Sequence, residues 1–336
     1  MPDMTARAHR TIAAATLIAL AIGVSAPARA QDLEAVNYPN RPIHIIVPFP
    51  PGGPTDILTR IVAKEMTASW GQTVVIENRP GADTTIGAEV VAKADPDGYT
   101  LLAAMDSTMV LNPLVKKELP YDPARDFEPI SLGAKNISVL EVRGDFNAHT
   151  VHDLLDTLKE RPGKLNFGTG TTNGRLAALL FAKLTGTNFA IIPYKGSAET
   201  VEGLLTGSVD FGIDGMASSY PFIKDGKFRA LAKLSDRPLS QLPDLPPLAE
   251  AAGVPELGDI STWIAFYAPA GTSSEITGKL QHFIATIYAD PAVAKRLQEA
   301  GIIAVSSTPG ELKAFVRSET ERWGKVIHDN ASYIFE

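Results

Sequence analysis

The alternation of strands and helices is the feature of this sequence that most restricts its fold. An apolar, β-branched run that begins at Pro42 leads through a proline- and glycine-rich loop into an amphipathic helix, which is expected to end before Gly71. A second strand over residues 73–77, a helix over 86–94 and a third strand over 99–104 follow. Strands that alternate with helices in this way predict a parallel sheet with helices on both faces.

A second α/β unit follows the turn-rich stretch over residues 122–129. Its expected strands cover residues 137–142, 164–167, 189–194 and 208–213, and its expected helices cover 151–160 and 198–205. A glycine-rich corner over residues 168–174 leads into a further helix, which is expected to open at Arg175. The segment from Trp263 onwards has one strand followed by helices, so it is expected to return and complete the first unit.

These units predict a bilobed α/β protein whose chain crosses twice between the lobes. Lobe 1 is expected to contain residues 31–138 and 262–336, and lobe 2 residues 139–261. The two crossings form a hinge near residues 136–142 and 258–266. Two lobes that each present a glycine-rich corner describe a binding protein that closes around a small acid.

The strand-to-helix corner over residues 49–56 is suited to hold an anion. The first amide groups of a helix lack intrahelical partners and carry partial positive charge, so a carboxylate or phosphate can bind there without a charged side chain. Taken alone, such a corner is commonly only a short connection. Its counterpart over residues 168–173 makes the pair more informative than either corner.

The N-terminus predicts export. Basic residues precede an apolar stretch over residues 12–24, and a small-x-small sequence ends at Ala30. This pattern is typical of a secretory signal peptide over residues 1–30, with cleavage after Ala30 and a mature periplasmic protein that begins near Gln31. The formal net charge of −7 disfavours nucleic acid as a partner.

The motifs of several common catalytic chemistries are missing from the sequence. It contains no cysteine, its six histidines form no cluster, and it has neither a Gly-x-Ser-x-Gly elbow nor a phosphate-binding Gly-x-x-x-x-Gly-Lys loop. We therefore expect no catalytic residue, no metal and no cofactor. An exported hydrolase that uses carboxylates alone remains the rival class.

Short motifs occur in order along the chain, over residues 38–56, 77–88, 96–101, 193–210 and 268–272. Together they resemble the periplasmic solute receptors of tripartite tricarboxylate transporters, the Bug or TctC-type proteins. The resemblance covers nearly all of the mature chain. It implies a Venus-flytrap fold of the type II-like kind, in which backbone amides and water at the two corners grip a carboxylate, and delivery of that carboxylate to membrane permease subunits.

The expected ligand-binding residues lie on the two corners and on neighbouring strand ends. They are Phe49, Pro50, Pro51, Gly52, Gly53, Thr55, Asp56, Ser107, Gly168, Thr169, Gly170, Thr171, Thr172, Asn173, Arg175 and Asp214. Asp56 either pairs with the dipole of its helix or orders a water or a ligand group. Arg175 is either a solvated arginine or a contact to a second ligand carboxylate. Ser107, in a polar loop over residues 106–108, is expected to donate from its hydroxyl.

Two questions of function stay open at this point. A sensory receptor, which presents its bound ligand to a signalling partner, has the same closed, ligand-bound shape as a transport receptor. The departures from the family pattern, Asp83-Thr84 in place of glycines and Arg175 in place of a common histidine, leave the identity of the carboxylate open. A monomer is expected.

Overall fold

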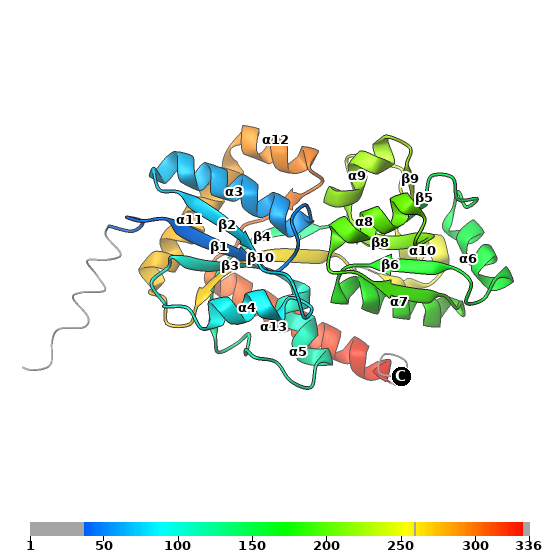
Figure 1. The fold of residues 1–336 in the computed structure, drawn as a ribbon, viewed down its shortest axis with the longest axis horizontal. Coiled ribbons are helices and arrows are strands. Elements are labelled where there is room, and N and C mark those ends of the chain that lie inside the picture. The colour runs from blue at the N-terminus through cyan, green and yellow to red at the C-terminus, as the bar shows by residue number, and fades with distance from the viewer. Residues whose placement is uncertain (1–36, 259, 332–336) are drawn as a thin grey trace, which may run out of the picture. The chain divides into compact units, whose positions relative to one another are not determined.

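The computed structural model describes residues 37–258 and 260–331. The described residues from Arg41 onwards form one compact unit. The predicted signal peptide and its cleavage after Ala30 lie outside the described residues. Within the unit from residue 41 onwards, two sheets, each covered by helices, make two lobes (Figure 1).

The first lobe is built on a six-stranded mixed sheet. In spatial order its strands are β11 (Ile303–Ala304), β4 (Phe127–Asn136), β10 (Thr262–Pro269), β3 (Thr100–Met105), β1 (Ile43–Val47) and β2 (Val74–Asn78). β1 pairs in parallel with β2 and β3, whereas β10 runs antiparallel to β3 and β4, and β11 runs antiparallel to β4. The prediction of a parallel sheet is confirmed for β1, β2 and β3, the strands from which it was made. The antiparallel strands β4, β10 and β11 extend this sheet on the side of β3.

Helices cover both faces of this sheet. They are α3 (Pro54–Trp70), α4 (Thr85–Ala92), α5 (Asn112–Val115), α11 (Ser274–Ala289), α12 (Pro291–Glu299) and α13 (Pro309–Asp329), with a π-helical segment η1 (Ser107–Leu111) before α5. α3 and α12 lie on one face and α4 and α13 on the other (Figure 1). Trp263 of β10 is fully buried and packs edge-on against Phe315 of α13, with ring centroids 5.4 Å apart. This packing role agrees with the apolar character of the strand.

The second lobe is built on a five-stranded sheet. In spatial order its strands are β7 (Ala190–Pro193), β6 (Asn166–Thr169), β8 (Phe211–Gly215), β5 (Ser138–Arg143) and β9 (Phe228–Lys233). Its helices are α6 (Val151–Glu160), α7 (Thr172–Thr185), α8 (Ser197–Thr206), α9 (Met216–Lys224) and α10 (Leu248–Ala252), with a 3₁₀ turn η2 (Pro255–Leu257). Phe167, Phe189 and Phe211 pack together, with ring centroids 5.0–5.6 Å apart. They belong to a hydrophobic core that also contains residues of the first lobe, such as Leu102 and Trp263.

The chain crosses between the sheets at two places. It passes from β4 to β5 through Ile137 alone, and it returns between the end of β9 at Lys233 and the start of β10 at Thr262. All strands of the second sheet lie between these crossings. The division of the chain at residues 138, 139, 261 and 262 stays a prediction.

Several local expectations differ from the structure. α7 begins at Thr172 rather than at Arg175, because the Thr171 side chain caps it by accepting a hydrogen bond from the Gly174 N–H at 3.0 Å. The segment that follows β3 is helical rather than a loop, since Asp106 caps η1. β4 and α9 were not anticipated, because Pro129 and Pro221 interrupt the patterns that would have indicated them. β9 was also not anticipated.

Candidate functional site

A small cavity of about 10 Å³ lies where the two lobes meet, which is roughly the space that one water molecule occupies. The residues that line it come from both lobes. They are Pro54, Met105, Asn136, Ser138, Gly170, Thr171, Asn173, Gly174, Ser197, Ile213, Asp214, Gly215 and Thr262. Four of them, Gly170, Thr171, Asn173 and Asp214, were predicted from the sequence.

Four α-helices begin at this cavity. Pro54 is the first residue of α3, Thr171 is the N-cap of α7, Ser197 is the first residue of α8, and Gly215 is the N-cap of α9. The unpaired amides at helix N-termini concentrate partial positive charge. None of the described residues that line the cavity is basic, and Asp214 is its one acidic residue. The partial positive charge that the lining brings to the cavity therefore comes from the backbone.

Buried polar atoms without a partner gather at the same place. Asn136, Asn173 and Asp214 line the cavity, and one side-chain oxygen of each, Asn136 Oδ1, Asn173 Oδ1 and Asp214 Oδ2, has no hydrogen-bond partner within the described part of the chain. The hydroxyls of Thr55 and Ser107, two predicted site residues, are also buried without a partner among the described residues. Polar groups that stay unpaired in a protein interior are costly and often mark a binding site.

Asp214 is the titratable group of the cavity. Its Oδ1 accepts hydrogen bonds from the Ser197 hydroxyl and from the Gly215 N–H at 2.6 Å. Burial raises the pKa of Asp214 to about 6, although both hydrogen bonds oppose the shift. Glu141, which is fully buried, accepts a hydrogen bond from the Ser219 hydroxyl at 2.8 Å. Burial and the Asp214 charge raise the pKa of Glu141 well above its ordinary value.

The first glycine corner, residues 49–56, is held by Asp56. The carboxylate of Asp56 accepts hydrogen bonds from the Gly52 N–H at 3.0 Å, from Asn78 Nδ2 at 3.0 Å and from Arg60 Nε at 2.9 Å. Burial raises the pKa of Asp56, but the hydrogen bonds from Arg60, Gly52 and Asn78 outweigh burial and hold that pKa below its ordinary value. Gly52 has a φ of 88°, which favours glycine. Asp56 therefore orders the corner rather than pointing at the cavity.

The same corner packs against the start of α8 in the other lobe. A Cβ atom added at Gly196 would lie 2.8 Å from Pro50 Cδ, and one added at Gly53 would lie 3.9 Å from Ser197 Cβ. A Cβ atom at Gly215 would lie 2.8 Å from Pro54 Cγ. Glycines at these positions allow the two lobes to approach each other closely.

Hydrogen bonds also join α7 to the first lobe. Asn173 Nδ2 donates to Asp106 Oδ2 at 2.7 Å, and the Thr172 hydroxyl donates to Asn112 Oδ1 at 2.9 Å. Burial raises the pKa of Asp106 to about 7, against the hydrogen bonds from Ser107 and Asn173. Asp106, Asn112 and Asn136 were missed from the sequence. Asp106 and Asn173 lie 67 positions apart, so no local pattern links them.

A strained turn supports Asn112. Ala82, Asp83 and Thr84 have φ values of 47°, 53° and 75°, in the left-handed region that residues other than glycine rarely adopt. Thr84 Oγ1 accepts hydrogen bonds from Thr108 Oγ1 at 3.0 Å and from Asn112 Nδ2 at 3.2 Å, and the Asp83 carbonyl also accepts from Asn112 Nδ2. The unusual backbone thus positions the side chain that meets α7.

The other predicted residues are not among those that line the cavity. This group consists of Phe49, Pro50, Pro51, Gly52, Gly53, Thr55, Asp56, Ser107, Gly168, Thr169, Thr172 and Arg175. Arg175 is half-buried in the first turn of α7. Its contact with a second ligand carboxylate stays a prediction.

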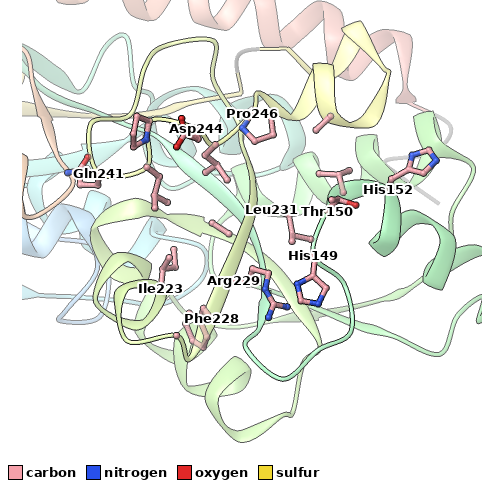
Figure 2. A pocket seen from close by; sticks show the side chains of 17 residues that line it. His149, Thr150, His152, Ile223, Phe228, Arg229, Leu231, Gln241, Asp244 and Pro246 are labelled. Atoms are coloured by element: carbon pink, nitrogen blue, oxygen red, sulfur yellow. The ribbon is translucent and has the colours of Figure 1, made fainter.

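A larger cavity of about 690 Å³ lies along β9 in the second lobe and shares no lining residue with the first (Figure 2). His149, His152 and Arg229 line it. The Arg229 guanidinium donates hydrogen bonds to the carbonyls of Gly144, Phe146 and Ala148, each at 3.0 Å. The Arg229 cation is thus occupied in holding the loop over residues 144–148. This cavity is therefore a weaker candidate for binding an anion.

Two searches of the described residues gave no site or span of another kind. No group of three or more His, Asp or Glu side chains there is arranged to hold a metal ion. No described helix is both long and apolar enough to cross a membrane.

Comparison with known proteins identifies the family. The model of the tripartite tricarboxylate transporter family receptor matches residues 58–331. The chain belongs to this receptor family. Protein BugT of Bordetella pertussis is 34% identical over 326 residues, which cover 96% of this chain and 98% of BugT. The predicted relation to Bug proteins is confirmed.

Two solved structures from Rhodopseudomonas palustris share the fold. Rpa4515 with adipate is 34% identical with a TM-score of 0.84, over 87% of this chain and 98% of that protein. MatC (Rpa3494) with bound malate is 28% identical with a TM-score of 0.80, over 86% of this chain and 100% of MatC. The predicted bilobed α/β periplasmic-binding-protein fold is confirmed, and the family is one of solute-binding receptors.

Proposed function

We propose that this chain is a periplasmic receptor that binds a small carboxylate between its lobes and delivers it to the membrane permease subunits of a tripartite tricarboxylate transporter. The observation that carries the proposal is the convergence of four helix N-termini on one cavity whose described lining has no basic side chain. Backbone amides arranged in this way favour an anion. The adipate and malate in the two related structures support a carboxylate.

The proposal assigns distinct roles to the predicted residues. Backbone amides of residues 49–56 and 168–173 grip the carboxylate, directly and through water. Asp56 acts through the corner that it orders. Lobe 1, over residues 31–138 and 262–336, closes on lobe 2, over residues 139–261, and carries the ligand to the permease without chemical change.

Binding is tested by native mass spectrometry of the mature protein as purified, followed by calorimetric titration with mono-, di- and tricarboxylates and aromatic acids. We expect one bound acid per chain, and we expect that acid to be recovered unchanged. If no acid of the panel binds, the proposal that the chain is a carboxylate receptor is contradicted. If the bound acid is converted to a product, the proposal that the receptor has no catalytic activity is contradicted.

A variant pair tests whether the cavity is the site. Ser138→Asp adds a negative charge to the cavity lining, so the affinity for a carboxylate should fall more than tenfold. Ser274→Asp adds the same charge at the exposed start of α11, where an acidic residue is favourable, and should leave the affinity unchanged. Equal affinities of the two variants would place the site elsewhere.

Export is tested separately. N-terminal sequencing of the protein from a periplasmic extract should start at Gln31, and an intact N-terminus would contradict the predicted cleavage after Ala30.

A further inference from the structure

The cavity presents oxygen acceptors whose orientation the surrounding hydrogen bonds fix. Asn136 Nδ2 donates to Thr262 Oγ1 at 3.1 Å, and the Thr262 hydroxyl in turn donates to the Asn136 carbonyl at 3.3 Å. Thr262 Oγ1 can then only accept from the amide, so the orientation of the Asn136 amide is set. Its Oδ1 is therefore a buried acceptor without a partner within the described residues, on a residue that lines the cavity.

The other two acceptors are fixed in the same manner. Asn173 Nδ2 donates a hydrogen bond to Asp106 Oδ2, and Asn173 Oδ1 has no partner among the described residues. Asp214 accepts its hydrogen bonds from Ser197 and Gly215 on Oδ1, and Asp214 Oδ2 has no partner among the described residues. Asn136 and Asn173 are each 1% exposed and Asp214 is 7% exposed, so bulk water cannot satisfy them.

A plain carboxylate does not match this set of groups. Its oxygens accept hydrogen bonds from the helix N-termini, but they have no hydrogen to give to three further acceptors. A hydrocarbon chain next to the carboxylate would bury these acceptors unpaired, which is unfavourable. A hydroxyl group offers one hydrogen-bond donor and an ammonium group offers three. The positive charge of an ammonium group is also attracted by the negative charge of ionised Asp214.

We propose that the ligand carries a hydrogen-bond donor, a hydroxyl or an ammonium group, within one or two bonds of the gripped carboxylate, and that Asn136, Asn173 and Asp214 recognise this donor. The inference rests on the proposed function, because it names the class of carboxylate that the same cavity selects. It restricts the ligand to hydroxy acids and amino acids.

Matched ligand sets test the inference on the wild-type mature protein. Calorimetric titration compares propionate, lactate and alanine; succinate, malate and aspartate; and adipate, 2-hydroxyadipate and 2-aminoadipate. Within the set whose chain length fits, we expect a donor-bearing acid to bind at least tenfold more tightly than the plain acid. The hydroxy and amino members of that set then distinguish the two sources of the donor.

The outcomes separate this inference from the proposed function. If plain and substituted acids of the fitting length bind within threefold of one another, water satisfies the three acceptors and the inference fails, while the receptor stands. If no member of any set and no other carboxylate binds, the proposed function fails and the inference fails with it.

A variant pair adds a second readout. Asp214→Asn keeps an oxygen for Ser197 and Gly215 but turns an amide N–H₂ toward the cavity, so an acceptor becomes a donor. We expect the tenfold preference for the donor-bearing acid to disappear, because the plain acid should bind more tightly once the negative charge beside its carboxylate is removed, whereas the donor-bearing acid loses an acceptor. Asp225→Asn makes the same chemical change at the exposed end of α9 and should keep the preference. A preference that survives Asp214→Asn would overturn the role of Asp214.

Discussion

Replacing Gly196 by alanine should weaken ligand binding without weakening the fold of either lobe. Gly196 has a φ of 173°, which is extended backbone that alanine adopts without strain. The new Cβ would lie 2.8 Å from Pro50 Cδ and 3.3 Å from Pro50 Cγ, both atoms of the opposite lobe. Ordinary carbon contacts are about 3.5–4.0 Å. The lobes must therefore separate at this point by roughly 0.7–1.2 Å on the closer contact.

The magnitude follows from the rigidity of the neighbour. A proline ring cannot rotate away, so the clash falls on the approach of the two lobes and costs about 1–3 kcal/mol, as overpacking of an interior does. If the ligand binds only to the closed arrangement, its dissociation constant should rise by roughly 5- to 150-fold. Calorimetric titration with the tightest acid of the matched sets measures this change.

The control is Gly278→Ala in α11, where an added Cβ has no neighbouring atom within 4 Å. It should leave affinity unchanged and stabilise the helix by about 0.5–1 kcal/mol. An unchanged affinity for Gly196→Ala would refute the reasoning. A lower melting temperature of the ligand-free Gly196→Ala variant would also refute the reasoning, because it would show that the clash destabilises the fold of one lobe and not the approach of the two lobes.

Three further substitutions test hydrogen bonds and buried charges. Thr172→Val removes the donor to Asn112 and should weaken binding about 5- to 30-fold in the same titration, because closure then buries an unpaired acceptor at a cost of about 1–2 kcal/mol; unchanged affinity would contradict a role in closure. Asp56→Asn should lower the free energy of unfolding at pH 7 by about 1.5–3 kcal/mol in urea titrations. The lowered pKa of Asp56 stabilises the wild type above pH about 4, and this contribution is lost as the pH falls through the folded-state pKa, so the difference between the two proteins should shrink on acidification. Glu141 has a raised pKa, so the folded protein retains a proton that the unfolded chain releases, and stability falls as the pH rises. Glu141→Gln should therefore be more stable than the wild type at pH 8 by more than about 1 kcal/mol and show no such gain at pH 4; a variant less stable at pH 8 would contradict the sign.

The sequence predicted those elements whose signals are local. β1 and α3 follow from a β-branched run, a glycine loop and a proline at the first helical position, which together define the corner before any contact is known. The start of α7 was placed three residues late. Gly174 looked like the end of a loop, whereas the hydroxyl of Thr171 already caps the helix.

The long-range partners had no such signal. Asp56 was identified as a site residue, but its sequence position does not reveal that Asn78, 22 positions away, holds its carboxylate. Asn136 was placed in the predicted hinge near residues 136–142, but the strand that it ends was not predicted. Its unpaired oxygen becomes meaningful only when Gly215 and Thr262 are placed beside it. Such groups are defined by the meeting of two lobes, and no periodicity encodes that meeting.

The use of helix N-termini instead of basic side chains has a consequence for the conditions under which the receptor works. Exposed ion pairs weaken as dissolved salt rises, because mobile ions screen charges within about 8–10 Å at physiological concentrations. If the acid binds as proposed, the amides at the starts of α3, α7, α8 and α9 act in a small cavity whose lining residues are buried or half-buried, where mobile ions have little access. The receptor would then keep the same affinity for its acid when the surroundings of the cell change from dilute to saline. The amount of acid bound would depend on the concentration of the acid and not on the ionic strength of the medium.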